Sequence, residues 1–188
     1  GGRGGGGLMA DERVLVGHAR AGNQAAFAAL FDAYYGPIVG YLYQLVRDRD
    51  VADDLAQETF LRAYRALGRT DPDLAFRAWL YRIATNAARN HLRRQRLLRW
   101  LPLGLGAVEP APSPGPGEQI ARQELVVETL RRIGTGNASA LLLHHHQGLS
   151  LRETAAALDL GVNATKVRLF RARKAFVRIY AALAGDQP

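Results

Sequence analysis

The sequence contains no cysteine and a single methionine. Without thiols the chain can form neither disulfides nor cysteine-ligated metal sites, and this composition fits a reducing cytoplasm. No apolar stretch approaches the ~20 residues that a membrane-spanning helix needs. We therefore expect a cytoplasmic protein with no membrane insertion of its own.

Strand patterns are also missing. Regular alternation of apolar and polar residues is absent, while alanine, leucine and arginine dominate, and both features favour helix. Apolar residues make up 48% of 188 residues, a composition and length that suit one or two small packed domains. The predicted fold class is all-α, with two small helical domains.

A proline- and glycine-rich segment separates the two helical halves. Residues 101–117 read LPLGLGAVEPAPSPGPG, and such a composition sustains neither helix nor sheet. We predict an N-terminal domain over 9–99, a flexible linker over 100–117 and a C-terminal domain over 118–185. Residues 1–8 lack the apolar core of a signal peptide and are interpreted as a tag remnant. We expect no fused sensor or inhibitor after the second domain.

The net charge is +8 and the pI is about 10.4, which favours nucleic acid or an acidic protein surface as a partner. Against this background, residues 50–61 read DVADDLAQETFL and are acidic. Helical spacing predicts a buried stripe, made of Ala56, Phe60, Ala63, Tyr64 and Leu67. The face turned outward carries Asp54, Gln57, Glu58, Leu61 and Arg65.

Two interpretations of this acidic face stay open on spacing alone. Acids near the start of a helix are stabilised by its dipole, and the face could simply be solvated. A face that mixes carboxylates, an amide and an exposed leucine could instead bind a basic protein surface. In either case it would repel DNA.

The next predicted helix, from Phe76, is rich in arginine and has no acid between residues 77 and 99. Its core side is predicted to hold Phe76, Leu80, Ile83, Ala84 and Ala87. Its outer side is predicted to carry Arg82, Asn86, Arg89 and Arg93, with Trp79 and Asn90 at the edge. Arginine binds phosphates, asparagine reads base edges and aromatic rings stack on unpaired bases. The side therefore favours nucleic-acid binding, although core packing is the simpler role for Trp79.

The C-terminal half contains a predicted helix-turn-helix. Ser150 and Glu153 have the spacing of a capping box, so a helix begins there and runs to about Leu158. A turn over 159–162 follows, in which Gly161 is free to adopt a positive φ. The second helix has a predicted core face of Thr165, Leu169, Ala172 and Phe176 and an outer face of Asn163, Lys166, Val167, Phe170, Arg171 and Lys174. A basic, exposed second helix is typical of a helix that enters the DNA major groove.

Three adjacent histidines, His144 to His146, do not predict a metal site. Neighbouring helical positions point about 100° apart, so the three rings do not converge on one ion. No triad, phosphate loop or carboxylate pair is evident either. We expect no catalytic residue, no metal, no cofactor and no enzymatic activity.

Taken together, these residues resemble the extracytoplasmic-function (ECF) sigma factors of bacterial RNA polymerase, of the sigma-70 superfamily. The resemblance covers about residues 27–180. DDLAQETFLRAYRAL and FRAWLYRIATNAARNHLRR look like sigma domain 2, while QGLSLRETAAALDL and KVRLFRARKAF look like sigma domain 4. The resemblance implies promoter-specific transcription initiation, with recognition of the minus-ten and minus-thirty-five elements and promoter melting.

The resemblance also implies roles for the surfaces. The acidic face, with Asp54, Gln57, Glu58, Leu61 and Arg65, would bind the clamp helices of the polymerase's largest subunit. Phe76, Trp79, Arg82, Asn86, Arg89 and Arg93 would contact the minus-ten element, and the loop over 68–76 would receive a flipped base. The minus-thirty-five element would be contacted by Asn163, Lys166, Val167, Arg168, Phe170, Arg171, Arg173 and Lys174.

Further partners follow from the same resemblance: the flap of the second-largest polymerase subunit, promoter DNA and an anti-sigma factor. The alternative is a stand-alone helix-turn-helix regulator that acts without polymerase, but this leaves the acidic helix unexplained. A metal enzyme built on His144 to His146 is a third class, which the histidine spacing disfavours.

Overall fold

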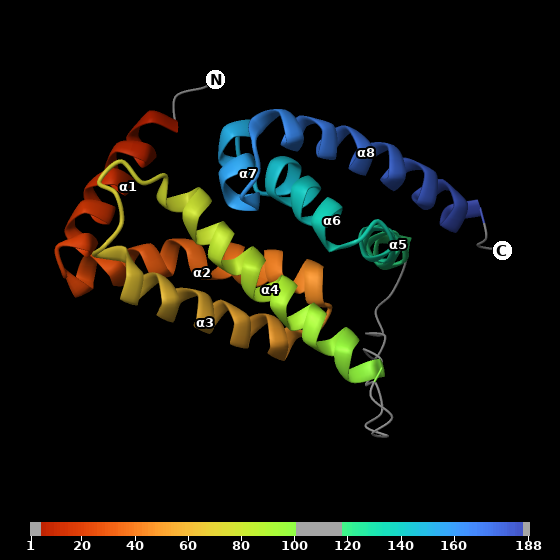
Figure 1. The fold of residues 1–188 in the computed structure, drawn as a ribbon, viewed down its shortest axis with the longest axis horizontal. Helices are drawn as coiled ribbons and strands as arrows, with labels where there is room; N and C mark the ends of the chain where they lie inside the picture. Colours follow the sequence, from red (N-terminus) through yellow and green to blue (C-terminus); the bar gives the residue numbers. More distant parts are fainter. Residues whose placement is uncertain (1–4, 101–117, 186–188) are drawn as a thin grey trace.

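The computed structural model describes residues 5–100 and 118–185, and within these ranges every regular element is helical. The chain folds in two halves, drawn in Figure 1. The N-terminal half contains α1 (Gly5–Arg20), α2 (Gln24–Val46), α3 (Arg49–Leu67) and α4 (Phe76–Trp100). The C-terminal half contains α5 (Glu118–Arg132), α6 (Thr135–Leu141), the π-helical turn η1 (Leu142–His146), α7 (Leu151–Leu158) and α8 (Val162–Gly185). The all-α prediction is confirmed.

Helix α2 is the centre of the N-terminal half, since α1, α3 and α4 all pack against it. Side chains cap the helices that follow the tight connections. The Asn23 side-chain oxygen Oδ1 accepts from the Ala26 backbone amide at 3.0 Å, and an Asp48 carboxylate oxygen accepts from the amides of Asp50 and Val51. Such caps satisfy amides that the first turn of a helix leaves unpaired.

The predicted helix-turn-helix is present as α7 and α8. The Ser150 hydroxyl accepts from the Glu153 amide, and the Glu153 carboxylate accepts from the Ser150 amide. One expectation is wrong: Asp159, with φ 56°, adopts the left-handed conformation, and Gly161 does not. Aspartate tolerates this region better than most residues, so the left-handed residue is the first of the predicted turn and not its glycine.

We expect Ser150→Ala to lower the free energy of unfolding by about 1 kcal/mol, because it leaves the first turn of α7 without its cap. Chemical denaturation followed by circular dichroism measures this loss. Arg152→Ala, an exposed change in the same helix, is the control and should stay within about 0.5 kcal/mol of wild type. An equal loss in both variants would contradict a specific capping role.

Two predicted boundaries are not tested by these helices. The segment 101–117 lies outside the described residues, so its linker role stays a prediction. Helix α1 begins at Gly5, inside the stretch interpreted as a tag remnant, and the origin of residues 1–8 also stays a prediction.

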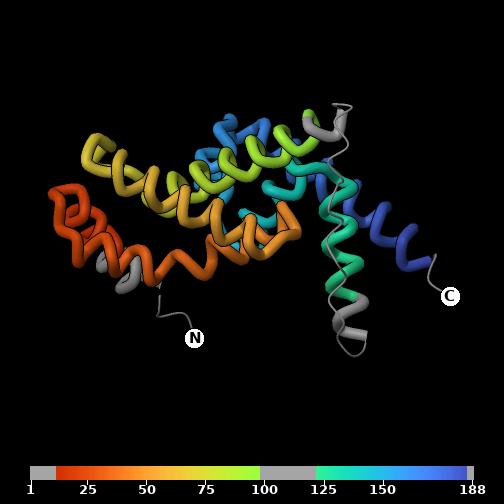
Figure 2. Tube along the Cα trace, turned by 90° about the horizontal axis from the view of Figure 1, so that it is seen from below, coloured from red at the N-terminus to blue at the C-terminus, as the bar shows by residue number. Residues whose placement is uncertain are grey.

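The buried core runs without interruption through both halves. Leu42, Tyr81 and Leu80 in the first half belong to the same cluster as Leu143 and Leu158 in the second. Helix α4 packs on α2 and α3 and also on α7, as the two views in Figures 1 and 2 show. The two halves are thus packed together in this structure.

Candidate functional site

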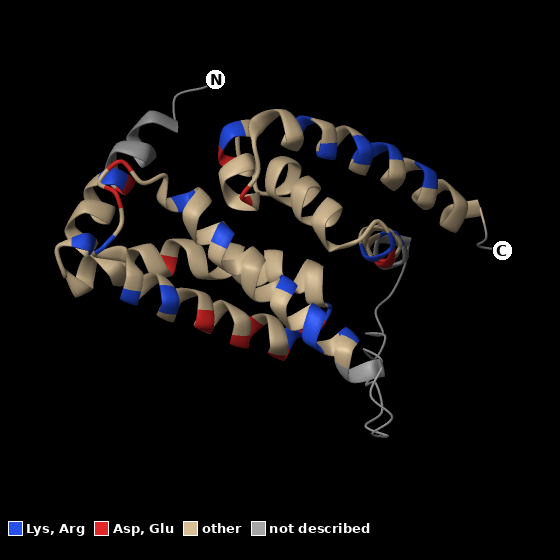
Figure 3. Cartoon of the chain, in the orientation of Figure 1, with Lys and Arg blue, Asp and Glu red and all other residues tan. Residues whose placement is uncertain are grey.

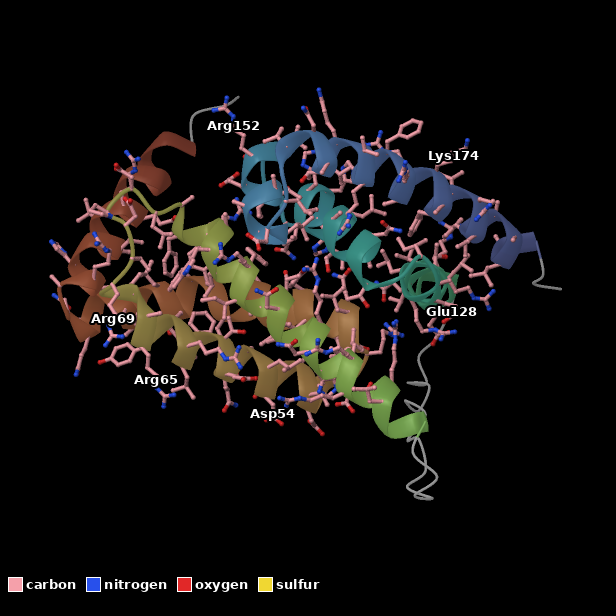
Figure 4. The ribbon with its side chains drawn as sticks, in the orientation of Figure 1. Asp54, Arg65, Arg69, Glu128, Arg152 and Lys174 are labelled. Carbon is pink, nitrogen blue, oxygen red and sulfur yellow. The ribbon has the colours of Figure 1, made fainter. Side chains whose placement is uncertain are left out.

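The outward face of α3 has the composition that its spacing predicts. Asp54, Gln57 and Arg65 are exposed, Glu58 is half-buried, and Leu61 is 55% exposed. Figure 4 shows Asp54 and Arg65 pointing away from the body of the protein, and Figure 3 shows the acids gathered along this helix. The face therefore presents carboxylates and a bare leucine together to a partner.

Neighbouring side chains hold this face in place. The Tyr35 hydroxyl donates to an Asp53 oxygen at 2.7 Å, and the Gln57 amide donates to the other at 2.8 Å. Asp53 is therefore engaged by two donors, whereas Asp54 is exposed. Glu58 pairs with Arg62 one turn later.

The assignment of Tyr64 to the buried stripe is wrong. Ala56, Phe60 and Ala63 are buried as predicted, but Tyr64 is 52% exposed. Its ring packs edge-on against Phe27, with 5.0 Å between the ring centroids. Tyr64 lies at the margin of the buried stripe, where its hydroxyl can contact water while part of the ring stays packed.

On α4 the predicted outer side is present, with Arg82, Asn86 and Arg93 exposed and Arg89 partly buried. Trp79 is partly buried and lies beside Phe76, with ring centroids 6.0 Å apart. Phe76 itself is only 2% exposed. Its burial assigns Phe76 to packing in this structure, so we leave it out of the DNA-contacting set.

The connection between α3 and α4 is held by a residue that periodicity did not reveal. The Arg20 guanidinium, at the end of α1, donates to the Thr70 carbonyl. The backbone of α1 also approaches closely here, because a Cβ on Gly68 would lie 3.5 Å from the Arg20 carbonyl oxygen. The Thr70 hydroxyl donates to the Leu67 carbonyl. Helix α1 therefore buttresses the loop that was predicted to receive a base.

We expect Arg20→Ala to speed amide hydrogen exchange in residues 68–75 by roughly tenfold, since a hydrogen bond from a charged group contributes about 1.5 kcal/mol. Hydrogen-exchange mass spectrometry measures this, with α8 as the internal reference. Arg13→Ala, an exposed change on the same helix, should leave the loop unchanged. Unaltered exchange in Arg20→Ala would refute the buttressing role.

The outer face of α8 is basic with apolar side chains interspersed. Phe170 is 70% exposed and Val167 is 48% exposed. The exposed side chains of this face are Asn163, Lys166, Val167, Phe170, Arg171 and Lys174. Figure 4 shows Lys174 on the opposite side of the molecule from Asp54. A shallow hollow runs beside Phe170 and Arg171 toward Arg178. Cations around apolar contacts suit a helix that meets both phosphates and base edges.

Two further predicted contacts on α8 are engaged within the protein. Arg168 is partly buried, and its guanidinium lies against Gly136 of α6. Arg173 is exposed and lies 3.1 Å from His145. Burial, then His144 and Arg173, lower the pKa of His145, so near neutral pH its ring can accept a hydrogen bond from Arg173.

The histidine run forms a π-helical turn, which the sequence did not predict. A ring nitrogen of His144 lies 2.8 Å from the Leu149 carbonyl oxygen, while His145 and His146 are exposed. Across the described residues no group of three or more potential ligands is arranged to hold a metal ion. The same residues include no helix long and apolar enough to cross a membrane.

Comparison with known proteins matches both halves to one superfamily. The model of Sigma-70 region 2 matches residues 30–97, and that of Sigma-70 region 4 matches residues 123–176. RNA polymerase sigma factor CnrH of Cupriavidus metallidurans is 38% identical over 174 residues, spanning 86% of this chain and 90% of the relative. The ECF RNA polymerase sigma-E factor of Escherichia coli is 34% identical over 176 residues, spanning 87% and 91%.

Comparison with solved structures also finds a sigma factor. The structure of CnrH in complex with the cytosolic domain of CnrY has a TM-score of 0.71 and 32% sequence identity, covering 94% of this chain and 99% of that chain. These matches give no support to a stand-alone helix-turn-helix regulator, because residues 30–97 already match Sigma-70 region 2. The chain belongs to the ECF family of RNA polymerase sigma factors, the initiation factors that bind RNA polymerase and direct it to promoters.

Proposed function

We propose that this sigma factor divides its tasks between three surfaces. The α3 face, with Asp54, Gln57, Glu58, Leu61 and Arg65, binds the clamp helices of core polymerase. The outer side of α4, with Trp79, Arg82, Asn86, Arg89 and Arg93, contacts the minus-ten element beside the 68–75 loop. The outer face of α8 contacts the minus-thirty-five element through Asn163, Lys166, Val167, Phe170, Arg171 and Lys174, while Arg168 and Arg173 help to orient it.

The observation that carries this proposal is the separation of charge. Carboxylates gather on the first part of α3, whereas cations line α8, as Figure 3 shows. An acidic face beside phosphates would weaken DNA binding. A basic face strengthens DNA binding through phosphate contacts and counterion release. The acidic face therefore suits a protein partner and the two basic faces suit DNA.

The proposed role is non-catalytic and cytoplasmic. The fold likeness to CnrH, which was solved with the cytosolic domain of CnrY, supports a regulatory protein as an additional partner. We propose an anti-sigma factor in this position, which could hold the chain near a membrane. Contact with the flap of the second-largest polymerase subunit is proposed for the C-terminal half.

Site-specific photocrosslinking tests the assignment, because a chain without cysteine gives each introduced thiol a unique label. A probe at Gln57→Cys should crosslink the largest polymerase subunit, one at Asn86→Cys the minus-ten region, and one at Lys174→Cys the upstream element. A probe at Glu124→Cys, an exposed position on α5 that belongs to none of the three surfaces, is the control. A probe on α3 that labels DNA instead of protein would overturn the division of tasks.

A further inference from the structure

The histidine run of η1 belongs to none of the three proposed surfaces. Its turn is π-helical, since the Gln147 amide donates to the Leu142 carbonyl at 2.8 Å, five residues back. Single π-helical turns are rare in proteins and occur frequently at functional sites. The partners of the three histidines therefore indicate what this turn does.

Two of the histidines hold the turn to its immediate surroundings. A carbonyl oxygen only accepts hydrogen bonds, so His144 Nδ1, at 2.8 Å from the Leu149 carbonyl oxygen, carries a proton and donates. His146 Nδ1 lies 3.0 Å from the side-chain nitrogen of the next residue, Gln147. Both contacts stay within η1 and its connection to α7.

The third histidine reaches another helix. His145 Nε2 lies 3.1 Å from a guanidinium nitrogen of Arg173 on α8, and both side chains are exposed. The ring also meets His144 edge-on, with 4.9 Å between the ring centroids. A guanidinium only donates hydrogen bonds, so Nε2 must accept and the His145 ring is neutral while this bond is made. Burial, followed by His144 and Arg173, lowers the His145 pKa in the same sense.

The charges around His145 do not stabilise a second cation in the unbound chain. Helices α6 and α8 carry no carboxylate, and the one carboxylate of α7, Glu153, is engaged in the cap of that helix. Arg152 of α7 is exposed, and Arg77 of α4 donates to the carbonyl directly after η1. A protonated His145 would therefore lie beside Arg173 with no unengaged carboxylate on α6, α7 or α8 to balance the two charges.

Arg173 belongs to the cationic side of α8 that Figure 3 shows. Helical spacing places it one turn from Phe170 and Val177 and two turns from Lys166, and all four side chains are exposed. Arg173, Phe170 and Val177 also line the shallow hollow on this helix. His145 thus lies at the margin of the face proposed to contact DNA, within hydrogen-bonding distance of one of its cations.

We propose that His145 and Arg173 together bind one backbone phosphate of the minus-thirty-five DNA, and that the His145 ring takes up a proton from solvent when this phosphate binds. The inference rests on the proposed function, because α8 must contact the DNA for the phosphate to arrive. Phosphate oxygens only accept, so the Nε2 atom that accepts from Arg173 in the unbound chain has to donate in the complex. A nearby anion favours the charged form of the ring.

Proton uptake sets the direction of the pH dependence. The His145 pKa is higher in the complex than in the unbound chain, so affinity for DNA rises as the pH falls. Each unit between these two pKa values is a factor of ten in affinity, and we expect a gain of about three- to tenfold between about pH 8 and about pH 6. The added cation also steepens the slope of log affinity against log salt by about 0.9.

Binding of the holoenzyme to promoter DNA at two pH values tests this pair. Core polymerase reconstituted with wild type or His145→Gln would be titrated onto a labelled fragment that carries both promoter elements. Glutamine can accept from Arg173 but cannot gain a proton. The variant should therefore match wild type near pH 8 and lack both the gain in affinity and the steeper salt slope near pH 6. The difference between the two proteins removes the pH dependence of the polymerase itself.

Two further variants sharpen the result. His145→Arg carries a fixed cation and should bind about three- to tenfold tighter than wild type near pH 8. His18→Gln, an exposed change on α1, is the matched control and should keep the pH response of wild type. An equal pH response in wild type and His145→Gln would overturn the inference. A wild-type holoenzyme that binds fragments with and without the minus-thirty-five element equally would instead count against the proposed function.

Discussion

Reversal of two carboxylates on α3, by Asp54→Arg with Glu58→Arg, is expected to weaken binding to core RNA polymerase by at least about 100-fold. Removing one partner of a charge pair in a protein interface typically costs about 2–5 kcal/mol, and reversal adds repulsion to that loss. Binding of labelled protein to purified core polymerase, followed by fluorescence anisotropy, measures the change.

The folded state should survive this reversal. Glu58→Arg places a second cation one turn from Arg62, but a like-charged pair at that spacing destabilises a helix by only about 0.5 kcal/mol. Asp54 is exposed and Glu58 is half-buried, so no charge becomes fully buried. Circular dichroism should therefore give an unfolding midpoint near that of wild type.

A charge-matched control separates the site from net charge. Asp32→Arg with Glu124→Arg changes the total by the same amount at exposed positions on α2 and α5. We expect it to retain wild-type affinity for core polymerase. Wild-type affinity in the α3 variant, or an equal loss in the control, would contradict the assignment of this face.

The second large effect is expected at Arg171. Its replacement by alanine should weaken upstream-element binding by the holoenzyme by about 10- to 100-fold, since a base contact by arginine contributes about 1–3 kcal/mol. Affinity for core polymerase should not change. Competition between cognate and altered upstream elements reports whether discrimination is lost together with affinity.

The salt dependence separates two kinds of contact. If Arg171 contacts a phosphate rather than a base, Arg171→Ala should weaken all sequences equally and reduce the salt slope by about one. Arg178→Ala, further along the same exposed face, provides the comparison. Equal loss of core binding and DNA binding in Arg171→Ala would contradict a groove-contacting role.

Local features of this fold follow directly from the sequence. The capping box of Ser150 and Glu153 forms because its two hydrogen bonds involve only neighbouring residues. Helical periodicity predicts which residues of α3 and α8 face outward, and the residue types at those positions give the charge of each face. These are the features that place the proposed partner surfaces, and the comparisons independently show the family.

Long-range features did not follow from the sequence, for physical reasons. Periodicity identifies one apolar stripe but not a second packing partner, so the burial of Tyr81 was missed. The bond from Arg20 to Thr70 joins residues far apart in the sequence, and no local pattern encodes it. The choice of Asp159 over Gly161 for the left-handed turn depends on where α7 ends, which composition alone leaves open.

The most direct test of the account is promoter-specific transcription by reconstituted holoenzyme. Purified core polymerase with and without this chain would be given genomic DNA of its own organism, and the transcript 5′ ends would be mapped. The account predicts discrete new start sites that share two upstream elements and vanish with Asp54→Arg and Glu58→Arg. Identical transcripts with and without the chain, when the protein is folded and bound to core, would contradict its role in directing initiation.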